Sequence, residues 1–259
     1  MLADYHIHTC YSGDSEAPIK EQLDAAAAAG LTHICFTDHV DFDGSHLTPA
    51  DISARNEEAL RLAPLYPSLD ISLGMEISLD GREASLLAHQ HAKDAHLDFI
   101  IGSVHTVNGI DAYFPEFFEN RTREETYSCY VEKMTRSIKV SDFSVMGHYD
   151  FCTKYSPYAE RPMKYSMFPQ MFDDIFRTLI HSGRSLEINS SSWRKDPAWG
   201  LDIFSRYREL GGEFVTLGSD AHKPARVGNR IAEAMELAKA AGIRYIATYK
   251  NMQPIMHKI

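Results

Sequence analysis

The sequence lacks the features that mark secreted, membrane-spanning and disulfide-stabilised proteins. No apolar run approaches the roughly 20 residues of a membrane-spanning helix, and no basic and apolar leader precedes Asp4. The four cysteines are scattered, without a CxxC pair or the spacing of a disulfide framework. These absences favour a soluble cytoplasmic protein with reduced thiols.

The chain also lacks the positive charge that a nucleic-acid partner would need. Lysine and arginine number 26 against 36 aspartate and glutamate residues, which gives a formal net charge of -10. Binding to a phosphate backbone relies on a dense surface of lysine and arginine. We therefore expect a small-molecule partner rather than a nucleic acid, although bound metal ions can still make a pocket locally positive.

Strand and helix patterns alternate along the chain, which is typical of a parallel sheet with crossover helices. No linker divides the 259 residues, so we expect one domain over residues 1–259. Seven or eight strand–helix units favour a barrel, and such barrels of roughly 250 residues form single domains. The strands are predicted at 3–8, 33–37, 71–75, 98–104, 143–146, 185–188, 214–218 and 244–248, where the last could close the sheet, and the helices at 18–29, 49–65, 82–95, 124–139, 168–181, 200–210 and 227–241.

Side chains that bind metals follow these strands at the point where each strand ends. His6 and His8 stand two residues apart at the end of the first strand, as Asp220 and His222 do after the seventh. Residues i and i+2 of an extended segment point the same way, so each pair can reach one ion. The active site of a (β/α) barrel lies at the C-terminal ends of its strands, where all of these side chains are expected to meet. The candidate ligands are His6, His8, Asp14, His39, Glu76, His105, His148, Asp220 and His222.

The residue types in this set indicate the kind of ion. Neutral imidazoles mixed with carboxylates suit zinc, iron, manganese or cobalt. Nine donors exceed the needs of one four-coordinate ion, so we expect two or three divalent ions that share carboxylates. A single histidine at a strand end is more often a hydrogen-bonded structural residue, and it is the joint placement that favours the ligand role.

Such a site favours the hydrolysis of a charged ester. A hydroxide that bridges two ions is a nucleophile at neutral pH, and paired ions clamp the attacking and leaving oxygens. Arg194, after the sixth strand, and Arg161, in an irregular loop, are candidate phosphate ligands, because guanidinium groups match phosphate geometry. The leaving group is expected to receive its proton from a metal-bound water or from His222.

Two long stretches between predicted elements, residues 107–120 and 152–165, carry several aromatic residues. Aromatic side chains in such loops form a lid or a pocket wall, or they pack beneath the loop, and both alternatives stay open at this point. The candidates for a pocket wall are Tyr113, Phe114 and Tyr158.

Short motifs surround the candidate ligands along nearly the whole chain, from residue 5 to residue 222. They are His6-x-His8, Thr37-Asp38-His39, Glu76, Gly102-Ser103-Val104-His105, Gly147-His148-Tyr149-Asp150, Glu187-Ile188-Asn189-Ser190 and Leu217-Gly218-Ser219-Asp220-Ala221-His222. Together they resemble the PHP (polymerase and histidinol phosphatase) superfamily. The last four motifs look like those of its monofunctional histidinol-phosphate phosphatases.

The resemblance implies a distorted TIM-like (β/α)7 barrel with a trinuclear site that hydrolyses L-histidinol phosphate in histidine biosynthesis. Glu76, Asp220 and His222 are the implied catalytic residues, and Asp14 stands where relatives have a histidine. The implied ligand sets are His6, His8, Glu76 and Asp220 for one ion, Glu76, His105 and His148 for a second, and Asp14, His39 and His222 for a third.

Two further carboxylates fit a supporting role, because metal-bound histidines usually need a partner for their second ring nitrogen. Asp38 and Asp150 are expected to orient imidazoles in this way. Two other functions stay open. The chain could be a PHP phosphoesterase for another small ester, a nucleotide or an oligonucleotide end, or it could be a metal-binding scaffold without catalysis.

Overall fold

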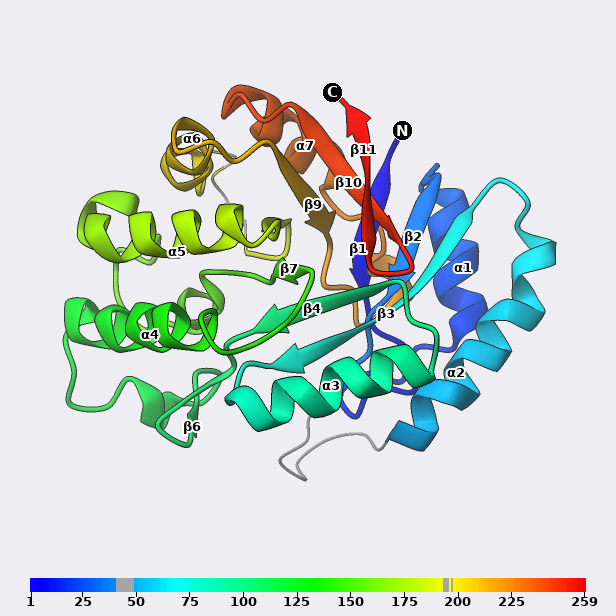
Figure 1. Cartoon of the computed structure of the whole chain (residues 1–259), viewed down its shortest axis with the longest axis horizontal. Helices are drawn as coiled ribbons and strands as arrows, with labels where there is room; N and C mark the ends of the chain where they lie inside the picture. Colours follow the sequence, from blue (N-terminus) through cyan, green and yellow to red (C-terminus); the bar gives the residue numbers. More distant parts are fainter. Residues whose placement is uncertain (41–48, 193–195, 197) are drawn as a thin grey trace.

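The computed structural model describes residues 1–40, 49–192, 196 and 198–259, and its elements alternate as the sequence predicts. Helices surround a curved parallel sheet (Figure 1). The parallel strands are β1 (Ala3–Ile7), β2 (His33–Phe36), β3 (Asp70–Ser78), β4 (Phe99–Ser103), β7 (Val145–Met146), β8 (Ser185–Asn189) and β9 (Phe214–Gly218), and the helices are α1 (Ile19–Ala28), α2 (Pro49–Leu62), α3 (Arg82–Asp94), α4 (Arg123–Ser137), α5 (Pro169–His181), α6 (Leu201–Glu209) and α7 (Ile231–Ala240).

The sheet closes into a distorted (β/α)7 barrel, as expected. The strands pair in the order β1-β2-β3-β4-β7-β8-β9, and the segment after β9 returns to β1. Ala221 makes a parallel bridge to Ile7, with the His8 N–H donating to the Ala221 carbonyl at 3.0 Å. β7 forms only two register pairs with each neighbour, which makes the ring irregular.

The strand predicted at 244–248 does not close the sheet. It is β10 (Tyr245–Lys250), which pairs in parallel with β9 and then folds back on the antiparallel β11 (Gln253–Lys258). Asn251 and Met252 take left-handed backbone conformations that make this tight turn. The hairpin crosses the barrel where its strands begin (Figure 1), and the Met252 N–H donates to the Asp98 carbonyl.

An apolar cluster fills the barrel at the end where the hairpin crosses. Barrel interiors are packed with side chains, and here two of them come from β10. The ring of Tyr5 lies edge-on to Phe99 at 5.3 Å. The cluster consists of Ala3, Tyr5, Cys35, Phe99, Ile101, Val145, Ala247 and Tyr249. The proposed ligands lie at the opposite end, where the strands finish.

The helices cover the barrel through apolar stripes of helical period. On α5 the buried positions are Phe172, Ile175, Phe176 and Leu179, which share one face. Thr122 and Glu125 form a reciprocal capping box at the start of α4. None of the helices described is both long enough and apolar enough to cross a membrane.

Several boundaries differ from prediction because of local contacts. β3 continues past Met75 to Ser78, so that Glu76 lies within the strand. α7 begins at Ile231 rather than at residue 227, because Gly228 and Arg230 take left-handed conformations. The stretch 107–120 contains a hairpin of β5 (Thr106–Val107) and β6 (Ile110–Asp111). The short 3-10 helices are η1 (Ala63–Leu65), η2 (Pro115–Phe117), η3 (Phe151–Thr153), η4 (Tyr165–Met167) and η5 (Pro224–Arg226).

Candidate metal centre

The nine predicted ligands come together at the C-terminal end of the barrel, around the carboxylate of Glu76. This buried side chain projects from β3, and its two oxygens face different imidazoles. Oε2 lies 3.1 Å from His6 Nε2, 3.4 Å from His8 Nε2 and 3.2 Å from His39 Nδ1. Oε1 lies 2.9 Å from His148 Nε2 and 3.4 Å from His105 Nε2.

Two further carboxylates complete the cluster. Asp220 Oδ1 lies 3.5 Å from His8 Nε2, on the side of β1. Asp14, in the loop after β1, lies with Oδ2 2.8 Å from His222 Nε2 and 3.5 Å from His39 Nε2. The carboxylate of Asp14, at a position where the resemblance implies a histidine, therefore contacts both of the imidazoles with which the resemblance groups it.

The donor atoms form groups of a size that suits a metal ion. Within each group the atoms lie within 4.8 Å of one another, and the groups are His6, His8 and Glu76, then His39, Glu76 and His105, then His8, Asp14, His39 and His222. His8 and His39 each belong to two groups, whereas the resemblance gave each of them to one ion. The division of ligands among ions stays a prediction.

One buried atom in the cluster fits a cation directly. His8 is fully buried, and its Nε2 has no hydrogen-bond partner in the described part of the chain, although it faces Glu76 and Asp220. A buried nitrogen without a partner costs free energy. A metal ion between this nitrogen and the two carboxylates would satisfy it, so the residues present fit the implied metal.

The second ring nitrogen of several ligands is held by the protein. Fixing Nδ1 in this way leaves Nε2 directed at the cluster, as in metal-bound histidines generally. The pairs are His6 Nδ1 with Glu187 at 2.6 Å, His8 Nδ1 with Ser12 at 3.1 Å, His105 Nδ1 with Ser78 at 3.2 Å and His222 Nδ1 with the Asp220 carbonyl at 3.0 Å.

Burial and mutual contact set the protonation of the cluster. Burial, with the neighbouring His222 and His39, lowers the pKa of His8 to about 3, so its imidazole is neutral at neutral pH. Burial would raise the pKa of Glu76, but the nearby His6 and His39 hold it well below its ordinary value. A neutral imidazole and an ionised carboxylate are the forms that bind metal ions.

Two residues at the centre have no role predicted from the sequence, although Glu187 belongs to one of the motifs that carry the resemblance. Glu187, on β8, contacts His6, and Lys154, whose side chain is 6% exposed, lies with Nζ 2.5 Å from Asp220 Oδ2. A charged residue inside the apolar run of β8 was a signal that could have drawn attention to Glu187. Lys154 lies in an irregular stretch that gave no such signal.

The expectation for Asp38 and Asp150 was wrong. Asp38 accepts hydrogen bonds from the backbone and hydroxyl of Thr9 and from Arg55 Nη1 at 3.1 Å. Asp150 accepts from Trp199 Nε1 at 2.7 Å. Both carboxylates therefore hold other segments of the chain, and neither hydrogen-bonds an imidazole of the cluster within the described residues.

The two predicted phosphate ligands are not joined to the cluster by the contacts described. Arg194 lies outside the described residues. The Arg161 carbonyl accepts from the Tyr127 hydroxyl at 2.8 Å, and within the described ranges no contact connects its guanidinium with the ligands. The substrate-binding role of both arginines stays a prediction.

An aromatic surface leads from the outside to the ligand cluster. The ring of Tyr113, which is 50% exposed, lies 4.3 Å from that of Tyr155. Tyr155 contacts Phe151, whose ring centroid lies 5.1 Å from those of both His105 and His148. These residues from both long loops therefore form one wall beside the cluster.

Of the other aromatic residues in the two loops, some extend the wall and others pack within or beneath the loops. Phe114 is exposed and packs edge-on against Tyr113, which extends the wall. Tyr158 instead ties the loops together, since its hydroxyl donates to the Arg121 carbonyl. Phe117 and Phe118 are buried and pack beneath the loop.

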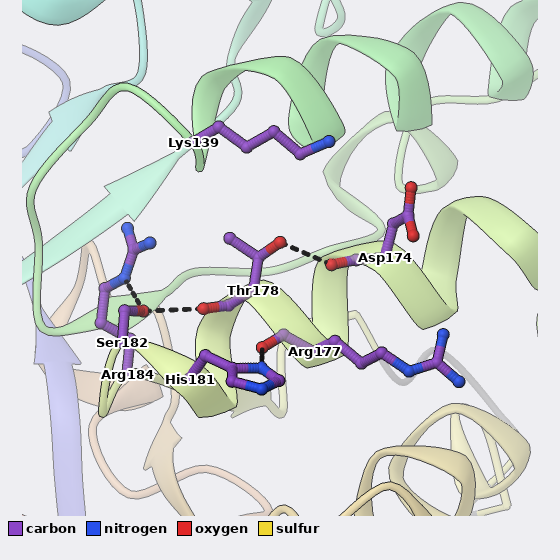
Figure 2. Close-up of a pocket in the computed structure, with 7 residues that line it drawn as sticks. All are labelled: Lys139, Asp174, Arg177, Thr178, His181, Ser182 and Arg184. Carbon is purple, nitrogen blue, oxygen red and sulfur yellow. Dashed lines mark hydrogen bonds between the residues drawn. The ribbon is translucent and has the colours of Figure 1, made fainter.

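A separate surface cavity of about 460 Å³ lies at the C-terminal ends of α4 and α5 (Figure 2). This end of the barrel is opposite to the ligands, because β8 begins just after α5. Two of its side chains contact backbone carbonyls: Arg184 donates to the carbonyls of Ser141 and Ile138, and His181 Nδ1 lies 2.6 Å from the Arg177 carbonyl. The guanidinium of Arg184 lies at the C-terminus of α4, where a positive charge is stabilising.

Comparison with known proteins agrees with this geometry. The chain is 31% identical to the histidinol-phosphatase of Lactococcus lactis, over 96% of this chain and 95% of the relative. A crystal structure of histidinol phosphate phosphatase from that organism, complexed with zinc, L-histidinol and phosphate, matches with a TM-score of 0.89 and 29% identity over 98% of both chains. A structure of metal-dependent tyrosine phosphatases from Bacillus subtilis and Streptococcus pneumoniae, with a TM-score of 0.50 and 15% identity over 99% of this chain and 100% of that one, shares the fold.

A family model also matches this chain. The model of the PHP domain covers residues 4–191, which is most of the chain and includes seven of the nine candidate ligands. The resemblance inferred from the motifs is thereby confirmed. This chain belongs to the PHP domain family.

Proposed function

We propose that the chain is a metal-dependent phosphomonoesterase that hydrolyses L-histidinol phosphate to L-histidinol and phosphate, in histidine biosynthesis. The observation that carries the proposal is the whole-length match to an enzyme whose crystal structure holds zinc, L-histidinol and phosphate. The buried cluster of imidazoles and carboxylates supports it. We also propose that residues 1–259 form one domain.

The donor set suits two or three divalent transition-metal ions, with zinc, iron or manganese as candidates. Such ions supply Lewis acidity, which activates water and neutralises phosphoryl charge. The proposed ligand sets are His6, His8, Glu76 and Asp220, then Glu76, His105 and His148, then Asp14, His39 and His222.

Three residues carry the proposed catalytic roles. Glu76 separates two groups of imidazoles, and the Ser103 hydroxyl donates to its Oε1 at 2.5 Å and orients it. Asp220 faces His8 with one oxygen and Lys154 with the other. His222, whose side chain is 29% exposed, lies at the rim, where it can hold or release a proton toward solvent.

The substrate presents a phosphate at one end and imidazole and ammonium groups at the other. Arg194 and Arg161 are proposed for the phosphate, since guanidinium forks match its oxygens. The wall of Tyr113, Tyr155 and Phe151 is proposed for the other end, because aromatic faces attract cations and stack with flat rings.

We further propose a cytoplasmic location and a small-molecule partner, without a nucleic acid. All four cysteines are free, which suits a reducing compartment. The net charge of -10 opposes binding to a phosphate backbone.

The test is phosphate release from L-histidinol phosphate, nucleotides, sugar phosphates and single-stranded DNA, by protein whose metals have been counted by elemental analysis. We expect a large kcat/KM preference for L-histidinol phosphate that is lost on chelation and restored by zinc, manganese or iron. A higher kcat/KM for another ester would refute the substrate. A fully metallated protein without turnover on any ester would indicate a scaffold.

A further inference from the structure

The carboxylate of Glu187 lies in the barrel interior beneath the proposed metal ligands. Its side chain is 1% exposed and projects from β8 toward β1. Oε1 lies 2.6 Å from His6 Nδ1, while Oε2 accepts from the His148 N–H at 2.8 Å and from Asn189 Nδ2 at 3.1 Å. One side chain thus connects two of the proposed ligands, His6 on β1 and His148 in the segment after β7.

The barrel leaves room for this contact because Gly218, on the path to His6, has no side chain, while Gly147 leaves room for the Ser103 hydroxyl. A Cβ at Gly218, on the strand between β8 and β1, would overlap Glu187 Oε1 and lie 2.5 Å from the Cβ of His6. A Cβ at Gly147 would lie 3.7 Å from Glu187 Oε2 and overlap the Ser103 hydroxyl. The fold therefore provides a channel in which the carboxylate of Glu187 reaches His6.

The contact decides which nitrogen of His6 is available. An ionised carboxylate only accepts hydrogen bonds, so the proton of neutral His6 is on Nδ1. Nε2 is then free, and it faces Glu76 Oε2 at 3.1 Å and Asp220 Oδ1 at 3.6 Å. The charge of the carboxylate also makes the imidazole a stronger donor to a cation.

We propose that Glu187 is a positioning residue of the metal centre: it fixes the Nδ1-protonated form of His6, orients the His148 segment and thereby sets the affinity of the ion that His6 binds. The inference rests on the metal centre of the proposed function. Glu187 lies behind the ligands and belongs to none of the donor groups found among the described residues.

The conservative variant Glu187→Gln isolates this role. The two oxygens of Glu187 accept from three donors, which are His6 Nδ1, the His148 N–H and Asn189 Nδ2. A glutamine has one acceptor oxygen and one NH₂ group of the same size, so at least one donor must face an NH₂ group. Size and packing are kept, while the charge and one hydrogen bond are lost.

The matched control is Asp98→Asn, which removes another buried carboxylate at the opposite end of the barrel. Asp98 accepts from the N–H groups of Leu73 and Asn251 and pairs with Lys250. It contacts none of the proposed ligands within the described chain. Any general effect of losing a buried charge appears in both variants, whereas an effect on the metal centre appears only in Glu187→Gln.

The experiment measures zinc affinity by competition with a chelator, together with zinc stoichiometry and the thermal stability of each chelated protein. We expect Glu187→Gln to bind one ion about 10- to 100-fold more weakly, while Asp98→Asn matches wild type in zinc binding. Zinc affinity in Glu187→Gln within about threefold of wild type, for every ion, would overturn the inference.

The readout also separates this inference from the proposed function. If the wild-type chain binds no zinc, manganese or iron, the metal centre itself is refuted, whatever the variant does. If Glu187→Gln does not fold, Glu187→Asp is measured instead. That variant keeps the charge but withdraws the carboxylate by one methylene. A smaller loss of zinc affinity is then expected, and an unchanged zinc affinity would refute the inference.

Discussion

Replacing Arg55 with methionine is expected to lower the free energy of unfolding by about 3 kcal/mol. Arg55 projects from α2 and is fully buried. Its guanidinium donates to the carbonyls of Phe36 and Gly74 at 3.1 and 2.7 Å and to Asp38 Oδ2 at 3.1 Å. It therefore ties the end of β2 to the middle of β3, close to His39 and Glu76 of the metal centre.

The magnitude follows from what the substitution leaves behind. Removing one partner of a buried ion pair costs about 3–5 kcal/mol, because the remaining charge is buried without compensation. The lower end applies here, since Asp38 keeps its hydrogen bonds from Thr9. For a chain of this size 1 kcal/mol corresponds to about 2–4 °C in Tm, so a decrease of about 6–12 °C is expected.

The assay is urea denaturation of the chelated protein, so that metal binding does not contribute. Arg61→Met on the same helix is the control: this side chain is 70% exposed and lies 3.8 Å from Glu58, so a loss below about 0.5 kcal/mol is expected. The double variant, with Arg55→Met and Asp38→Asn, should lose less free energy of unfolding than the two single variants lose in sum. A loss below about 1 kcal/mol for Arg55→Met, or strict additivity, would refute the reasoning.

Three further predictions concern the metal centre. Glu76→Ala should lose at least one ion and nearly all turnover, as checked by elemental analysis and phosphate release; a fully metallated, active variant would remove Glu76 from its bridging role. Asp14→Ala should lose no more than one ion, because the ion pairs of Asp14 within the described residues are with the outer imidazoles His39 and His222, and loss of all metal would contradict the separate third site. Arg194→Ala should raise KM for L-histidinol phosphate with metal content intact, and unchanged kinetics would exclude it from the site.

The parallel barrel and its ligand-bearing end could be predicted because both depend on local patterns. Alternating strand and helix periods specify crossover connections, and the crossovers place all strand ends on one side. The nine ligands follow these ends, so their convergence required only the fold. Boundaries such as the start of α7 were less accessible, since they depend on the contact of the Gly228 N–H with Asp4 across the molecule.

Other parts of the site depend on tertiary contacts that no local pattern carries. Strict alternation would put the neighbours Tyr5 and His6 on opposite faces of β1. The register with β2 shifts between Asp4 and Ile7, so Tyr5 reaches the apolar cluster while His6 reaches Glu76. The partners of Asp38 were mispredicted for the same reason, because Arg55 arrives from a different element.

The β10–β11 hairpin joins the last strands of the chain to the first one. The Tyr249 N–H donates to the Tyr5 hydroxyl across 244 residues of sequence. A chain that emerges from the ribosome with its N-terminus first exposes every proposed ligand before this contact can form. Because pairings between distant segments are slow to form, we expect this contact to form after the nearer strands have paired. A nascent chain therefore presents its histidines to cellular metal ions while the barrel is still open at the other end.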